Sequence, residues 1–80
     1  MNDAEIVTRV GELTEEEHRL QRSHAASPLD AEQLARLQSI EVALDQCWDL
    51  LRQRRALRET GRDESEAQVR PPEVVEKYVG

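Results

Sequence analysis

Aromatic residues are almost absent from this chain, which has no phenylalanine, one tryptophan and one tyrosine among 80 residues. Leu, Ile, Val and Phe together number 18, just above the ~20% level below which disorder is the better expectation. A chain of this length buries only roughly 60% of its unfolded surface, so it depends on good helix packing or oligomerisation. We therefore expect a seam of Leu, Val and Ala side chains between helices, not a core built on large aromatic residues.

A single cysteine, Cys47, excludes an internal disulfide, so the chain lacks the pattern of a disulfide-stapled secreted domain. The first residues include neither the basic stretch nor the apolar stretch of a secretory leader. No apolar run approaches the ~20 residues that span a bilayer. We therefore expect a cytoplasmic protein with no membrane segment.

Positive charge is concentrated in one segment of an acidic chain, whose formal net charge is −6. Residues 52–62 contain five arginines and one acidic residue. The acidic majority disfavours general binding to nucleic acid or membranes, because phosphate groups would repel most of the surface. One interpretation of the basic segment is that it binds nucleic acid or a phosphate ligand. The other is that it complements the dipole of its helix and pairs with nearby acids, either Asp3 and Glu5 or Glu73 and Glu76 of the tail. The arginines in question are Arg52, Arg54, Arg55 and Arg58.

Apolar residues at heptad-like spacing predict a first helix over about residues 3–24. Asp3 is its expected N-cap, because a short side-chain oxygen can accept a hydrogen bond from the first turn. Gly11 lies inside the helix and lowers its propensity. The residues of the seam are Ile6, Val10, Leu13 and Leu20.

A second helix is predicted over about residues 31–60. Pro28 disfavours helical conformation at the residue before it, and Asp30 followed by Gln33 matches a capping box. Gly61 suits the position that follows a helix end. Because the connection is short, residues 1–61 should form an antiparallel helical hairpin, and the fold class should be all-α.

Residues 62–80 are expected to form a polar linker and then a short C-terminal helix or arm. Pro72 suits the first position of that helix. The arm would dock on its own hairpin or reach another chain, and the sequence leaves both arrangements open. Its apolar side would carry Val74, Val75, Tyr78 and Val79.

The second helix has an apolar arc wider than one neighbouring helix can cover. Two hairpins are therefore predicted to pair into a dimeric four-helix assembly. Trp48 would anchor that interface, or cover Ile6 inside the hairpin, or do both. Glu17 and Glu41 would extend along the edge of the seam or pair with arginines of a second chain. The predicted interface residues are Leu37, Leu44, Cys47, Trp48, Leu50, Leu51 and Leu57.

No catalytic arrangement is evident. Glu15 and His18 have the Glu-x-x-His spacing of di-iron helical bundles, but Glu15 falls about 180° from Ile6 around the helix. Cys47 lies mid-helix on an apolar face between two aspartates, which favours a small buried residue over a reactive thiolate. We predict no enzyme activity, catalytic residue, metal site or cofactor. The leading hypothesis is a non-enzymatic protein–protein interaction module, such as a small adaptor or regulator. It would self-associate as a dimer or bind an unidentified protein.

Three runs of the sequence carry a family resemblance. They are EEEHRL at residues 15–20, LDQCWDLLRQRRA at residues 44–56 and VRPPEVVEKY at residues 69–78. With these runs the chain resembles, over nearly its whole length, a family of short uncharacterised bacterial proteins known only as a domain of unknown function. The resemblance implies a small, cytoplasmic, mostly helical protein. It implies no activity, ligand or catalytic residue.

Overall fold

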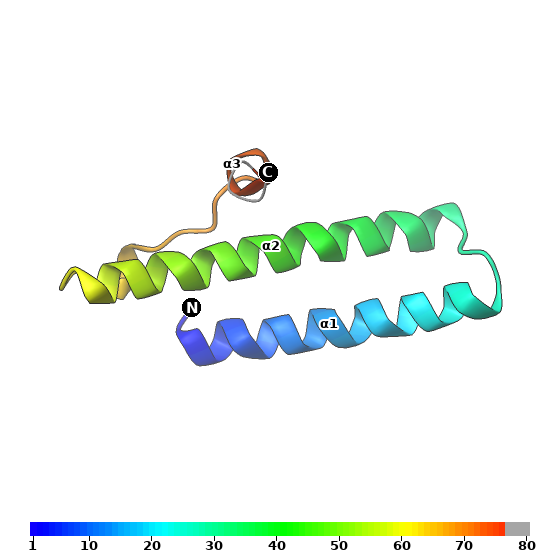
Figure 1. Ribbon diagram of the computed structural model, residues 1–80, viewed down its shortest axis with the longest axis horizontal. Coiled ribbons are helices and arrows are strands. Elements are labelled where there is room, and N and C mark those ends of the chain that lie inside the picture. Colours follow the sequence, from blue (N-terminus) through cyan, green and yellow to red (C-terminus); the bar gives the residue numbers. More distant parts are fainter. Residues whose placement is uncertain (77–80) are drawn as a thin grey trace.

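The computed structural model describes residues 1–76, which form two long helices and a short third one (Figure 1). Helices α1 (Asp3–Ala26) and α2 (Ala31–Glu59) run antiparallel and side by side. The chain then turns back through a 3-10 turn, η1 (Glu64–Glu66), to helix α3 (Pro72–Glu76), which packs on α2. The predicted all-α class, a long helical hairpin with a short C-terminal helix, is confirmed.

Asn2, not Asp3, caps the start of α1, so the predicted N-cap was wrong by one residue. The Asn2 side chain accepts a hydrogen bond from the Glu5 N–H at 2.8 Å, and the Asn2 N–H donates to the Glu5 carboxylate at 3.0 Å. This reciprocal pair is a capping box. The cap moves because Asp3 is drawn into ion pairs with Arg54 and Arg58 of α2.

Helix α2 begins and ends with the signals expected from its sequence. The Asp30 side chain accepts from the Gln33 N–H at 2.8 Å, and the Asp30 N–H donates to the Gln33 side chain at 3.0 Å. At the other end, Gly61 adopts φ of 74°. The Gly61 N–H then donates to the Arg58 carbonyl at 3.1 Å, and the Arg62 N–H donates to the Leu57 carbonyl at 2.8 Å. These two bonds are the Schellman pattern, which satisfies carbonyls at the helix end.

Replacement of Gly11 by alanine should raise the free energy of unfolding by roughly 0.5–1 kcal/mol. An added Cβ would meet no atom within 4 Å there, and Gly11 lies inside α1, where alanine has the higher helix propensity. Gly61→Ala is the matched opposite, because its positive φ strains any residue with a Cβ. Urea denaturation followed by circular dichroism should show the two changes with opposite signs, and equal signs would contradict this account.

The apolar core is small and draws on all three helices. The buried apolar side chains are Ile6, Leu13, Ile40, Leu50 and Val75. Because so small a core buries little apolar surface, polar contacts also hold the elements together. Within residues 1–76, none of the helices is long and apolar enough to cross a membrane.

The C-terminal arm, residues 67–76, docks on its own hairpin. Val75 of α3 is buried, and α3 contacts α2 and lies on the side of α2 away from α1 (Figure 1). Helix α3 begins at Pro72, as predicted. Tyr78 and Val79, which were expected on the apolar side of the arm, lie outside the described residues.

Candidate functional site on helix α2

Side chains from one stripe of α2 hold the C-terminal arm. Gln53 bonds both backbone groups of Gln68, since its amide nitrogen donates to the Gln68 carbonyl at 2.7 Å and its amide oxygen accepts from the Gln68 N–H at 3.2 Å. Gln46 donates to the Arg70 carbonyl at 3.1 Å. Because positions 46, 49 and 53 are spaced by three and four residues, they share one face of α2.

Asp49 is the centre of this attachment, and its side chain is 0% exposed. Its carboxylate accepts hydrogen bonds from Nε of Arg70 at 2.9 Å, from Nη2 of Arg70, and from Nε2 of Gln53 at 2.8 Å. The Arg70 hydrogen bonds lower the pKa of Asp49, burial opposes them, and the Gln53 bond adds to the lowering. A charge-assisted bidentate pair therefore fastens the arm to the middle of α2.

A second polar cluster joins α1, α2 and η1 at the end of the hairpin where α1 begins and α2 ends. Arg54 is buried and donates both to Asp3 and, at 2.8 Å, to Glu64. Arg58 donates to the same carboxylates, at 2.8 Å to Asp3 and 3.2 Å to Glu64. The hydrogen bond from Arg54 lowers the pKa of Asp3, against an opposing effect of desolvation. The cluster therefore fixes the start of α1 and the turn after α2 together.

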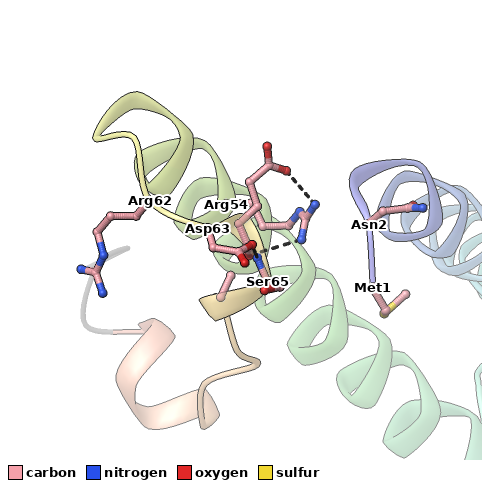
Figure 2. A pocket seen from close by; sticks show the side chains of 8 residues that line it. Met1, Asn2, Arg54, Arg62, Asp63 and Ser65 are labelled. Atoms are coloured by element: carbon pink, nitrogen blue, oxygen red, sulfur yellow. Dashed lines mark hydrogen bonds and ion pairs between the residues drawn. The ribbon is translucent and has the colours of Figure 1, made fainter.

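A polar hollow of about 590 Å³ lies beside this cluster (Figure 2). Its charged side chains are already paired within the chain. Arg62 meets Glu66 at 2.9 Å, and Asp63 accepts from the Ser65 N–H at 2.9 Å. A ligand entering the hollow would therefore meet charged side chains that, among the described residues, already have partners. It is lined by Met1, Asn2, Arg54, Arg62, Asp63, Glu64, Ser65 and Ala67.

All four arginines of the predicted anion-binding segment have acidic partners. Arg54 and Arg58 belong to the cluster with Asp3 and Glu64. The other two pair along α2: Arg52 lies 3.9 Å from Asp49, and Arg55 lies 3.0 Å from Glu59. Pairing with acids of the same chain, the second interpretation of this segment, therefore describes its geometry. Glu64 was not singled out from the sequence.

Cys47 lines a smaller hollow of about 220 Å³ between the two long helices and the arm. Burial raises the pKa of the Cys47 thiol, and the positive charge of Arg9 only partly offsets the effect. The thiol is therefore held in its neutral form, as its apolar setting in the sequence indicated. The other lining residues are Met1, Ile6, Arg9, Ala43, Gln46, Leu50 and Val69.

Three consecutive residues in the middle of α2 point in three directions, because each helical residue is turned by about 100° from the one before. Cys47 faces the hollow that it shares with Ile6 of α1. Asp49 faces the arm. Trp48 points between these directions and is 50% exposed. We call the sector of α2 that carries Trp48 the open face.

The open face continues along α2 and across to α1. Glu41 and Arg55, seven residues to either side of Trp48, are exposed, as is Leu34. In an antiparallel pair of helices, the residues that directly follow the facing positions project to the same side of the pair. Trp48 follows Cys47 in α2, and Val7 follows buried Ile6 in α1, so Val7 and Trp48 lie on the same side. Val7 is also exposed. This side therefore presents apolar side chains from both helices.

The predicted interface residues separate into different environments. Leu50 is buried within the monomer, and Trp48 is on the open face. The remaining five are half-buried: Leu37, Leu44, Cys47, Leu51 and Leu57. Whether they meet a second chain stays a prediction.

Sequence reasoning missed the residues that attach the arm. Asp49 was noted only as a flank of Cys47, and Arg70 only as part of the C-terminal runs. A signal was present, because Gln46, Asp49 and Gln53 form a polar stripe beside apolar positions of a helix that otherwise buries Leu and Ile. Nothing in that stripe indicated which part of the chain it would bind.

These features define a small helical hairpin whose C-terminal arm is fastened across α2 by a buried carboxylate. The chain belongs to the family described as protein of unknown function (DUF2630), whose model matches residues 2–80. It is 49% identical over 80 residues to uncharacterized proteins of Mycobacterium bovis and Mycobacterium tuberculosis, covering 98% of this chain and 91% of each relative. No solved structure is significantly similar to it.

Proposed function

We propose that this protein is a non-enzymatic protein–protein interaction module that self-associates through the open face. The observation that carries the proposal is the position of Trp48. It is half exposed in the middle of α2, in the sector between Cys47, which faces α1, and Asp49, which faces the arm. Tryptophan is among the residue types most enriched at the energetic centres of protein interfaces. A cytoplasmic location is part of the same proposal and rests on the single free thiol.

The margins of the open face support the same proposal. Leu37, Leu44 and Leu51 are half-buried beside it, and Val7 extends it onto α1. A single layer of two helices leaves such side chains partly in water, and a second layer would remove them from it. The alternative, nucleic-acid or phosphate binding by Arg52, Arg54, Arg55 and Arg58, has less support because each of these arginines has an acidic partner.

Replacement of Trp48 by alanine should weaken self-association by more than tenfold, because loss of a central aromatic anchor costs about 2 kcal/mol or more. Light scattering over a range of protein concentrations should give the molar mass of a dimer for the unmodified chain and of a monomer for Trp48→Ala. Val69→Ala is the matched control, since Val69 is exposed but lies on the arm. A monomer at every concentration, or an equally stable Trp48→Ala dimer, would contradict the proposal.

A further inference from the structure

Within seven residues of Trp48, the charges of the open face are acidic before it and basic after it. Glu41 and Asp45, seven and three residues before Trp48, are exposed and acidic. Arg52 and Arg55, four and seven residues after it, are exposed and basic. Because residues seven apart share one side of a helix, Glu41, Trp48 and Arg55 form a line of negative, aromatic and positive side chains.

We infer that α2 pairs with α2 of a second copy in antiparallel orientation, with Trp48 at the two-fold axis and Glu41 facing Arg55 of the second copy. This inference rests on the proposed self-association and specifies its geometry. Around a two-fold axis beside Trp48, a residue seven positions before it lies opposite the residue seven positions after it. Glu41 and Arg55 therefore meet twice, once on each side of the axis, and Asp45 lies near Arg52.

A parallel arrangement would place like charges together. Glu41 would then face Glu41, and Arg55 would face Arg55, which is unfavourable in an interface. The antiparallel arrangement converts the same four charges into two attractive pairs. Charge complementarity therefore selects both the second copy as the occupant of the face and its direction.

The pairs within the chain leave Glu41, Asp45 and Arg55 available for a second copy. Glu41 and Asp45 have no ion-pair partner within residues 1–76. Arg55 pairs with Glu59 at 3.0 Å, but the two side chains are 76% and 64% exposed. Such a pair on a helix surface is worth only a few tenths of a kcal/mol, so Arg55 can exchange it for a partner across the interface.

Charge reversal tests the orientation. In the antiparallel pair, Glu41→Arg and Arg55→Glu should each weaken the homodimer roughly tenfold at about 50 mM salt, because both attractive contacts become repulsive. The double variant Glu41→Arg/Arg55→Glu restores opposite charges and should return to within about threefold of the unmodified chain. Sedimentation velocity gives these dissociation constants, and circular dichroism checks that each variant is folded.

The controls separate the antiparallel register from the proposed self-association. Glu15→Arg and Arg22→Glu make the same charge changes at exposed positions of α1 and should leave the dissociation constant unchanged. Glu41→Arg is the decisive single variant, since it breaks no ion pair among residues 1–76. If the unmodified chain is monomeric, self-association itself fails. If it is a dimer that Trp48→Ala dissociates, but the single reversals have no effect or the double variant is not restored, only the antiparallel register is overturned.

Discussion

Arg70→Ala is expected to lower the free energy of unfolding by about 3 kcal/mol. The substitution leaves the carboxylate of Asp49, which is 0% exposed, without the two guanidinium hydrogen bonds that enclose it. The value falls at the low end for breaking a buried pair, because the arm can lift and admit water to Asp49. Urea denaturation measures the loss. For a chain of this size it is a large share of the total stability.

The control for Arg70 is Arg62→Ala. Arg62 also forms an arginine–carboxylate pair, with Glu66 at 2.9 Å, but both side chains are exposed. Its loss should cost less than about 1 kcal/mol. Equal losses for the two variants would show that burial of Asp49 contributes nothing to the attachment of the arm.

Acid titration of stability provides an independent readout of the same pair. The Arg70 hydrogen bonds lower the pKa of Asp49 in the folded protein. A group with a lowered pKa stabilises the fold above its unfolded-state pKa, and this contribution is lost as the pH falls through the folded-state value. The unmodified protein should therefore lose more stability on acidification than Arg70→Ala, which has already lost the pair at neutral pH.

Ile40→Ala should lower the free energy of unfolding by roughly 2–4 kcal/mol. Ile40 is 0% exposed and belongs to the small core, so removal of three side-chain carbons leaves a cavity. Leu34→Ala, in the same helix, is the matched control because Leu34 is 47% exposed. Its cost should stay within about 1 kcal/mol. Denaturation at low protein concentration keeps self-association out of the comparison, and similar losses for both variants would contradict the assigned core.

Local rules made the helices predictable. The spacing of Ile6 and Leu13 indicated a helical seam, and both residues are buried. Asp30 with Gln33, and Gly61, marked the limits of α2, because capping depends only on residues within a few positions of each other. The one capping error, Asp3 in place of Asn2, arose where a distant arginine competes for the carboxylate.

The candidate site was only partly predictable. The unusual position of Trp48 could be recognised from the width of the apolar arc on α2. Its exposure could not, because that depends on where the arm lies, and the arm is placed by bonds from Asp49 to Arg70, 21 residues away. That pairing leaves no periodic signal in the sequence. The partner of Arg54 differs, because Asp3, 51 residues distant, was among the acids expected near the basic segment once the hairpin closes.

The sequence by itself determined the all-helical class, the antiparallel hairpin and the apolar seam between its helices. These follow from hydrophobic spacing, capping and a short connection, which act over a few residues at a time. The tertiary structure alone decided that the arm docks on its own α2, that Arg54 and Arg58 share Glu64 as a partner, and that Trp48 is left on the open face. Those outcomes depend on which charged groups meet after the helices pack. A buried carboxylate needs a cationic partner, and the packing of the chain sets which residue supplies it.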